Sequence, residues 1–332
     1  MAHPYDSFIV VRWGIRKANR SPPTHHRFVI STEVKRPAFH KPCTLTVVLR
    51  VATISFLNPA PLLYNFEHAP HASELATRYT LHSTSPANCA AELQGGTADL
   101  GLIPIAALTP DLAIVPGCTI ASLHEVRSIL LLVKDSHHLP EAEALKQVRT
   151  LAVDAVSRSS QAYAQILFRH FLDIHPAIHE APADPLAMLT TADAALLIGD
   201  PALLAREHRE SIDAVSPTPI LWLDLATLWR HYTGLPWVAA VWAVRPESLT
   251  DITPTQLTTD LNDSRTSGLA HIDQLVAEWT PRLAVSPATI RTYLTENIHY
   301  NLDSACLKSI RLFRTLAAQI EVLPSLSNLS ML

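Results

Sequence analysis

Apolar runs that read as buried strands alternate with segments of helical spacing along most of the chain. Start and stop signals separate them, as where Ser85-Pro86 opens a predicted helix that Gly95-Gly96 ends. The predicted strands are residues 44–56, 78–83, 98–103, 113–121, 127–135, 150–154, 192–198 and 237–245. Helices are predicted at residues 62–66, 85–93 and 159–172, from residue 201 onward, and over the whole chain after residue 245. This alternation predicts an α/β fold built on a mostly parallel sheet.

Two of the predicted strands, residues 127–135 and 237–245, are long, apolar and unbroken. They bracket a second α/β series, which predicts two lobes joined by two crossings of the chain. The first lobe is predicted to hold residues 44–130 and 240–332, and the second residues 131–239. A cleft between two lobes is a common binding place for a small ligand. The alternative is one larger doubly wound sheet, which periodicity alone does not exclude.

Composition narrows the class of protein. The chain has 332 residues, of which 48% are hydrophobic and 17% charged, so it can bury a sizeable core. A net charge of −4 gives no reason to expect nucleic acid, and no apolar run approaches the ~18 residues of a membrane helix. The four cysteines are not paired at metal or redox spacing, and the 17 histidines form no H-E-x-x-H motif. We therefore expect no metal site and a reducing compartment.

Residues 1–43 differ from the rest of the chain. They carry eight Lys and Arg side chains against two acidic ones, and they show no sustained hydrophobic period. Their apolar patch at residues 8–11 is too short for the core of a signal peptide. We expect a basic leader that is disordered or that results from a mis-set translation start.

The corner between the strand at residues 51–56 and the following helix carries Asn58 and then Pro59. In open α/β sheets, ligands bind at the carboxyl ends of strands, so the Asn58 side chain is placed to face a ligand. Asn is also a frequent helix cap, and Pro is well tolerated at the first helical position. The residues alone favour the cap.

Ser157, Arg158, Ser159 and Ser160 lie between a predicted strand and the start of a predicted helix. A helix N-terminus offers free N–H groups and the positive end of the helix dipole, and both favour an anion. Hydroxyl groups and a guanidinium there make a candidate carboxylate site. An ordinary serine cap explains the same residues equally well.

Two further polar positions lie at predicted strand ends. Gly199 follows a strand and lets the backbone turn tightly, so a ligand can approach it, whereas Asp200 is predicted to cap the next helix. Ser128 starts the first long strand, where its hydroxyl can point into the cleft, although a lone serine there is usually structural. The aromatic residues of the segment 228–237 are predicted to pack at the lobe junction rather than to contact a ligand.

These stretches, taken together and in this order, resemble the chorismate dehydratases of the futalosine route to menaquinone. The resemblance covers roughly residues 46–324, and its most distinctive parts are TGLPWVAAVWAVR and LLIGD. It rests on ISFLNPAPL at 54–62, ADLGLIPIA at 98–106, EVRSILL at 125–131, SRSS at 157–160, LLIGDPAL at 196–203, LWRHYTGLPWVAAVWAVR at 228–245 and YLTENIHYNLD at 293–303.

The resemblance implies a two-lobed type 2 periplasmic-binding-protein-like fold and a cytoplasmic enzyme without metal or cofactor. The implied reaction is a hydro-lyase step that converts chorismate to 3-[(1-carboxyvinyl)oxy]benzoate and water. Asn58 matches the Asn of the family's F-L-N motif and Ser128 the Ser that follows V-R, and both are implied to be catalytic or to contact the substrate. We expect Ser157, Ser159, Ser160 and nearby N–H groups to hold the ring carboxylate.

Asn58 is expected to orient the substrate, because an amide is a very weak base. The substrate's own enolpyruvyl carboxylate is then the group that takes the proton. Two alternatives stay open: a 1,4-dihydroxy-6-naphthoate synthase of the same pathway, and a solute-binding protein without catalysis. The F-L-N motif argues against the first, and the lack of a visible signal peptide argues against the second. The sequence leaves the oligomeric state open.

Overall fold

The computed structural model describes residues 48–135, 137–154, 158–326 and 328–332. All of these belong to one compact unit, residues 46–332. The predicted basic leader, residues 1–43, and the candidate residue Ser157 lie outside the described part.

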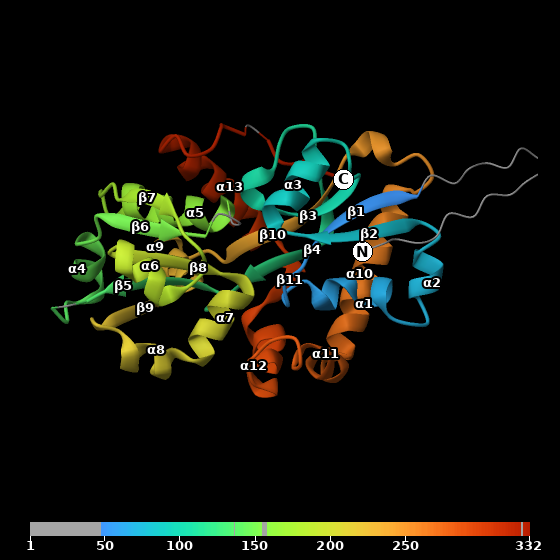
Figure 1. Ribbon diagram of the computed structural model, residues 1–332. Helices are drawn as coiled ribbons and strands as arrows, with labels where there is room; N and C mark the ends of the chain where they lie inside the picture. The colour runs from blue at the N-terminus through green and yellow to red at the C-terminus, as the bar shows by residue number, and fades with distance from the viewer. Residues whose placement is uncertain (1–47, 136, 155–157, 327) are drawn as a thin grey trace, which may run out of the picture. The chain divides into compact units, whose positions relative to one another are not determined.

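The first part of the fold is a seven-stranded sheet with the order β11-β4-β10-β3-β1-β2, in which β12 also pairs with β4 (Figure 1). We call the elements around this sheet lobe 1. Its strands are β1 (Leu49–Ile54), β2 (Tyr79–Thr84), β3 (Leu100–Pro104), β4 (Ala113–Ser122), β10 (Trp237–Val244), β11 (His299–Leu302) and β12 (Ser330–Met331).

The second part is a five-stranded sheet with the order β7-β6-β8-β5-β9, and we call the elements around it lobe 2. Its strands are β5 (Ile129–Lys134), β6 (Thr150–Val153), β7 (Ala177–Glu180), β8 (Ala194–Ile198) and β9 (Ile220–Asp224). The alternative of one larger doubly wound sheet is therefore wrong. The chain changes sheets at Ile129 and again at Trp237, close to the lobe boundaries predicted after residues 130 and 239, which stay predictions.

Both sheets are mixed, although most strands of each sheet run in one direction. β1 pairs in parallel with β2 and β3, as the β-α-β-α-β pattern requires. The two long strands break this rule, because β10 runs antiparallel to β3 and β4, and β5 runs antiparallel to β8 and β9. An unbroken apolar run shows that a strand is buried on both faces but not in which direction it runs.

The prediction of a wholly helical chain after residue 245 was also wrong. Strand β11 adds to β4 at the edge of the first sheet, and β12 adds to the start of β4. Both strands are short, β11 is only partly buried and β12 is exposed, so no apolar alternation marks them in the sequence. Strands β7 and β9 were also missed: β7 is short and largely exposed, whereas β9 carries the apolar run ILWL, which the sequence analysis did not single out.

Helices cover both sheets. Pro follows the capping residue at Ser85, Thr253 and Ser286, and each of these hydroxyls accepts a hydrogen bond from a free N–H of the first turn. The helices are α1 (Ala60–Glu67), α2 (Ala72–Leu75), α3 (Pro86–Gln94), α4 (Glu141–Lys146), α5 (Arg158–Gln165), α6 (Pro185–Thr191), α7 (Gly199–Glu207), α8 (Arg209–Val215), α9 (Leu225–Thr233), α10 (Pro254–Ala270), α11 (Ile272–Trp279), α12 (Pro287–Thr292) and α13 (Ser304–Gln319).

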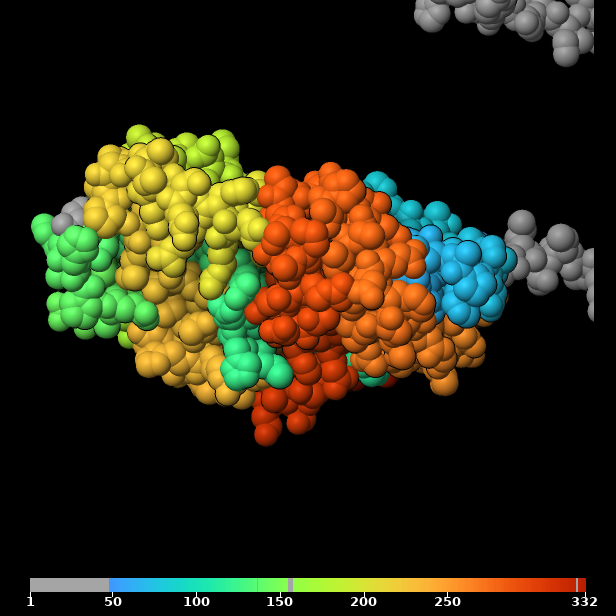
Figure 2. Space-filling model, turned by 90° about the horizontal axis from the view of Figure 1, so that it is seen from below, coloured from blue at the N-terminus to red at the C-terminus, as the bar shows by residue number. Residues whose placement is uncertain are grey.

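The turn from β4 into β5 is the first crossing between the lobes. In Figure 2 this green segment lies between the yellow part of lobe 2 and the orange C-terminal helices. Arg127 has a φ of 64° there, a conformation that costs a non-glycine residue energy. Buried Asp224 offsets that cost, because its carboxylate accepts from the Arg127 N–H at 2.7 Å and from the Val126 N–H at 3.0 Å. Glu125 further ties the turn to α7 through an ion pair with Arg206 at 2.9 Å.

Aromatic packing joins α5 to lobe 1. The Tyr163 ring on α5 lies 5.7 Å from the Trp237 ring and 4.3 Å from the Phe313 ring on α13, measured between centroids. Its hydroxyl donates to the Val238 carbonyl oxygen of β10 at 3.1 Å. The start of α5, where the candidate serines lie, is therefore fixed against the strand that returns to lobe 1.

Candidate functional site

A pocket of about 450 Å³, part of it open to solvent, lies where the strand ends of the two lobes meet. Residues of both lobes line it, and none of them carries a formal charge. They are Ile54, Phe56, Asn58, Pro86, Pro104, Ile120, Trp237, Ala239 and Ala240 from lobe 1, and Ile129, Ser159, Ser160, Ile198 and Gly199 from lobe 2. Four of the seven candidate residues named from the sequence, Asn58, Ser159, Ser160 and Gly199, are thus brought together.

Asn58 lies in the turn between β1 and α1, and it does not cap that helix. Pro59 occupies the capping position, and the buried Asn58 Oδ1 has no hydrogen-bond partner in the described part of the chain. The cap favoured from the residues alone was therefore wrong. The Asn58 carbonyl oxygen accepts from the Tyr300 hydroxyl at 3.0 Å, which fixes the turn so that the side chain faces the pocket.

Ser128 lies behind the pocket wall rather than in it. Its side chain is almost fully buried, and its Oγ accepts a hydrogen bond from the Tyr293 hydroxyl at 2.8 Å. The Asn58 side chain also hydrogen-bonds the Tyr293 hydroxyl, and burial raises the pKa of Tyr293, which keeps it a neutral phenol. Ser128 and Asn58 are therefore linked through Tyr293, a residue that the sequence analysis did not single out.

The serines at the start of α5 are buried, whereas Arg158 is exposed and does not line the pocket. The Ser159 Oγ accepts from the Ala106 N–H of lobe 1 at 3.1 Å, so the hydroxyl keeps its own proton for donation. At the following peptide group, the buried Arg314 guanidinium donates to the Ala106 carbonyl oxygen at 2.9 Å. Burial lowers the pKa of Arg314, and no carboxylate among the described residues pairs with it.

Gly199 starts α7 with a φ of +62°, and the Phe56 ring lies directly against it. A Cβ atom at this position would stand 2.8 Å from the nearest ring carbon. The Gly199 N–H donates to the Ser128 carbonyl oxygen at 2.7 Å, so this N–H is already used within the protein. What Gly199 offers a ligand is the space left by its missing side chain.

Asp200 does not cap α7, so that prediction was wrong. Its Oδ1 instead accepts from the Leu57 N–H of lobe 1 at 3.0 Å, next to Asn58. Burial raises the pKa of the Asp200 carboxyl to about 6, and the hydrogen bond from Leu57 opposes that shift. Asp200 thus holds the turn that carries Phe56 and Asn58 against lobe 2.

A larger pocket, of about 850 Å³, lies away from the lobe junction against α1, α2 and α10. Glu74, Asp260 and Asp263 line it, and its one arginine, Arg78, is paired with Glu74 at 3.2 Å and with Asp260 at 3.3 Å. Its acidic lining disfavours an anionic ligand, in contrast to the uncharged pocket between the lobes.

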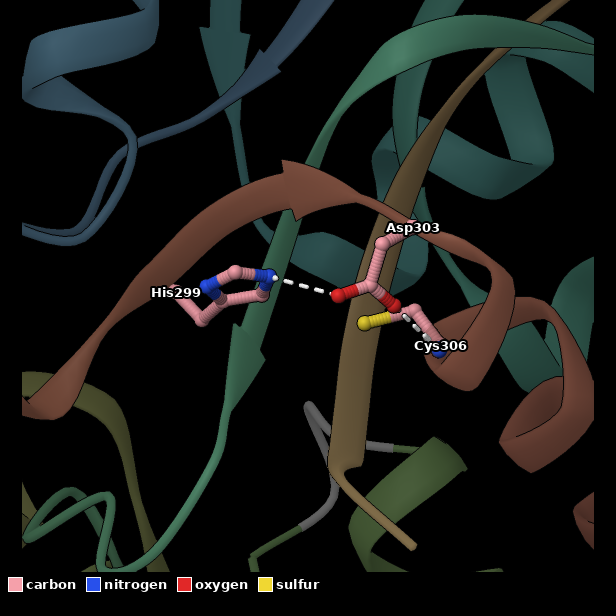
Figure 3. Close-up of side chains that lie close together, drawn as sticks. All are labelled: His299, Asp303 and Cys306. Atoms are coloured by element: carbon pink, nitrogen blue, oxygen red, sulfur yellow. Dashed lines mark hydrogen bonds and ion pairs between the residues drawn. The ribbon is translucent and has the colours of Figure 1, made fainter.

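One group of potential metal ligands occurs among the described residues: His299, Asp303 and Cys306, at the junction of β11 and α13 (Figure 3). Asp303 already caps α13, since its Oδ1 accepts from the Cys306 N–H at 2.8 Å, and its Oδ2 lies 3.4 Å from His299 Nε2. Burial raises the pKa of the Cys306 thiol to about 12, whereas a metal ligand must be a thiolate. The group is better explained as a helix cap than as a metal centre.

Comparison with known proteins shows to which family the chain belongs. The sequence profile of a family described as menaquinone biosynthesis matches residues 49–319, which is most of the chain. The chain belongs to the menaquinone biosynthesis family. A chorismate dehydratase from Thermus thermophilus is 30% identical to it over 209 residues, which cover 58% of this chain and 68% of that protein.

Solved structures agree with this chain in fold. A protein from Archaeoglobus fulgidus superposes with a TM-score of 0.62 at 13% identity, covering 83% of this chain and 98% of that one. The periplasmic aliphatic sulphonate binding protein of Escherichia coli superposes with a TM-score of 0.59 at 15% identity, covering 86% and 93%. This menaquinone biosynthesis protein therefore has the two-lobed periplasmic-binding-protein fold, as expected. No helix in the described ranges is both long and apolar enough to cross a bilayer.

Besides Tyr293, the residues Trp237 and Asp224 contribute to the site although the sequence analysis did not name them as site residues. Trp237 lines the pocket, although the aromatics of the segment 228–237 were expected only to pack. Asp224, which caps α9 and holds the first crossing, lies 97 residues from Arg127 along the chain. Contacts that far apart leave no pattern in a single sequence. For Trp237, the available signal was its place at the start of a strand in the lobe junction.

Proposed function

We propose that the protein is a chorismate dehydratase, a carbon–oxygen lyase that converts chorismate to 3-[(1-carboxyvinyl)oxy]benzoate and water. The proposal includes a small-molecule substrate, no cofactor and a cytoplasmic location. Membership in the menaquinone biosynthesis family and the similarity to the Thermus thermophilus enzyme support it. The observation that carries it is the pocket between the lobes, which combines an uncharged lining, buried serines and the unpartnered amide oxygen of Asn58.

The two carboxylates of chorismate need hydrogen-bond donors in such a pocket. The first turn of α5 supplies the Ser159 hydroxyl, and the positive end of the helix dipole favours a carboxylate there. The buried Arg314 guanidinium bonds the carbonyl oxygen of Ala106, the residue whose N–H donates to Ser159. We propose that Ser157, Ser159 and Ser160 hold the ring carboxylate, and that Arg158, being exposed, acts at most through charge.

The reaction breaks one C–H bond and one C–O bond of the ring. The C–H bond at the carbon that bears the enolpyruvyl ether is acidified, because the ring carboxylate accepts its electron pair through the conjugated double bond. The hydroxyl on the neighbouring carbon then leaves as hydroxide, takes up a proton to become water, and the ring becomes aromatic. Donors held against the ring carboxylate stabilise the charge that develops there.

No side chain in the described pocket lining is a good general base. The lining holds no His, Asp, Glu or Lys, and the Asn58 amide is a very weak base. We propose that the enolpyruvyl carboxylate of the substrate takes the proton and that Asn58 orients the substrate for this step. Ser128 contributes by holding Tyr293 against Asn58 rather than by touching the substrate.

The test is to incubate the purified protein with chorismate in the presence of a chelator and to follow the products by chromatography and mass spectrometry. The proposal predicts loss of one water with formation of 3-[(1-carboxyvinyl)oxy]benzoate. Unchanged chorismate from protein shown to be folded by circular dichroism would contradict it. The naphthoate synthase of the same pathway and a binding-only protein would then be tested next.

A further inference from the structure

Trp237 carries a buried hydrogen-bond donor that the part of the chain described by the structure does not use. The residue starts β10, is 1% exposed, and is one of the residues that line the pocket between the lobes. The Nε1 atom has no hydrogen-bond partner among the described residues. A buried N–H without an acceptor destabilises the fold, because it has lost its hydrogen bond to water, and a ligand that accepts this bond in a pocket restores what was lost.

Two other indole groups of the chain donate their N–H to an acceptor within the protein, as is usual. The Trp229 Nε1 donates to the Ser309 Oγ at 2.9 Å, and the Trp222 Nε1 donates to the Asp213 Oδ1 at 2.8 Å. Trp242 also leaves its Nε1 unpaired, but it lies within the core and does not line the pocket. What distinguishes Trp237 is therefore an unused donor together with a position on the pocket wall.

The pocket also contains an unused acceptor, the Asn58 Oδ1. A ligand that complements both atoms accepts a hydrogen bond at one point and donates one at another. Chorismate does so, because its carboxylates accept and its ring hydroxyl donates. A carboxylate gains more from Trp237 than a neutral acceptor does, since a hydrogen bond to a charged group is stronger and no cation is among the described residues that line the pocket.

The indole is held rigidly enough to act as a binding group. The Tyr163 hydroxyl bonds both the carbonyl oxygen and the N–H of Val238, at 3.1 and 3.3 Å, next to Trp237 in the chain. Tyr163 belongs to α5, which also carries Ser159 and Ser160. The indole N–H and the serine hydroxyls are thus fixed by one packing unit.

We propose that the Trp237 Nε1–H donates a hydrogen bond to a carboxylate of the bound substrate. This inference rests on the proposed dehydration of chorismate. Trp237→Phe keeps the flat ring and removes the donor, and Trp242→Phe is the matched control, because it removes an equally buried, unpaired N–H on the same strand. We expect Trp237→Phe to raise the KM for chorismate and the Kd for the product about 10- to 100-fold, the range for a hydrogen bond to a charged group.

Trp242→Phe is expected to leave both constants within about twofold, because its N–H lies outside the pocket. Equal constants for Trp237→Phe and wild type, or equal weakening by both variants, would overturn the role of Trp237. Absence of turnover by folded wild type would instead contradict the proposed function. An active wild type with an unchanged Trp237→Phe contradicts only this inference.

A second measurement needs no variant. In ¹⁵N-tryptophan-labelled wild-type protein, saturation with 3-[(1-carboxyvinyl)oxy]benzoate is expected to shift the Trp237 indole N–H resonance downfield. The Trp242 indole resonance serves as the internal reference and is expected to stay in place. A Trp237 resonance that moves no more than that of Trp242 would reject the hydrogen bond.

Discussion

Asn58 joins the two halves of the site at the level of single atoms. Its carbonyl oxygen is fixed by Tyr300 and its side chain hydrogen-bonds Tyr293, which leaves Oδ1 as the atom directed to a ligand. The Ser128 side chain is linked to Asn58 through Tyr293. Asn58 therefore combines a fixed position with an acceptor that no described residue uses, which is what orienting a substrate requires.

Removal of the Asn58 amide is expected to reduce turnover without unfolding the protein. We expect Asn58→Ala to lower kcat for chorismate about 100-fold, the loss typical of one aligned polar contact in an active site. Asn58→Asp is expected to be impaired as well, because a carboxylate would repel the substrate dianion. Full activity of Asn58→Asp in a steady-state assay would show that Asn58 does not act by orienting.

Asn65 provides the matched control for that substitution. It is also a buried asparagine whose Oδ1 has no partner in the described part of the chain, but it lies on α1 at the acidic pocket. We expect Asn65→Ala to keep kcat within about twofold. Its effect on the free energy of unfolding is expected to be similar to that of Asn58→Ala.

Asp200 is expected to make stability depend on pH. Its folded pKa of about 6 lies above the ordinary value of 3.8, so the folded state binds this proton more tightly than the unfolded state. The contribution to stability is full below pH ~4 and is lost as the pH rises through ~6. Asp200→Asn should therefore gain on the order of 2 kcal/mol of unfolding free energy relative to wild type between pH 4 and 7.5.

Asp193 is the opposite case and serves as the control in urea denaturation at the two pH values. Although burial alone would raise its pKa, hydrogen bonds from the Arg149 and Thr150 N–H groups lower it. Its contribution is already present above the ordinary pKa of 3.8 and is lost only in stronger acid. The difference between Asp193→Asn and wild type should therefore stay nearly constant between pH 4 and 7.5. A pH-independent difference for Asp200→Asn would contradict the assigned burial effect.

At the scale of elements, the close approach of α7 to the turn after β1 shapes the pocket. Gly199→Ala would place a Cβ 2.8 Å from the Phe56 ring at a residue with φ +62°. We expect a loss of stability above the ~1–2 kcal/mol of the backbone conformation alone, together with lower activity, because the ring must move into the pocket.

Gly234 separates the two effects. It ends α9 with a φ of +70°, and a Cβ there would meet no atom within 4 Å. Gly234→Ala is expected to show the backbone cost in thermal unfolding while kcat and KM stay unchanged. Equal activity of the two variants would show that contact between Phe56 and Gly199 does not matter for the site.

Several elements of this fold could be predicted from sequence because local signals repeat. Ser-Pro starts, Gly ends and apolar runs located α3, β3, β5, β8 and β10. Strand β11 could not be found, because its HYNL sequence is half exposed and becomes a strand only by pairing with β4. The directions of the long strands also depend on tertiary pairing, which periodicity does not record.

The same distinction holds for the candidate site. The sequence analysis identified Asn58, Ser159, Ser160 and Gly199 because they follow the ends of predicted strands. Such positions can be recognised from the neighbouring sequence alone. The partner of Asp200 is the Leu57 N–H, 143 residues away, so its sequence context indicated a cap that the structure does not have. Buried, unpaired atoms such as the Trp237 Nε1 become visible only when all neighbours are known.

On the scale of the whole molecule, two mixed sheets joined by two crossings leave the pocket between them. The same fold occurs in the sulphonate binding protein of Escherichia coli, so the fold alone does not distinguish binding from catalysis. What favours catalysis here is membership in the menaquinone biosynthesis family together with the Asn58, Tyr293 and Ser128 arrangement.

The most direct test of where the chemistry takes place is a crystal structure with 3-[(1-carboxyvinyl)oxy]benzoate, the stable aromatic product of the proposed reaction. The account predicts electron density for its ring between Asn58 and Ser159, with a carboxylate at the start of α5 and another acceptor oxygen at the Trp237 indole. Density in the acidic pocket around Asp260, or none at saturating product, would contradict the assignment of the site.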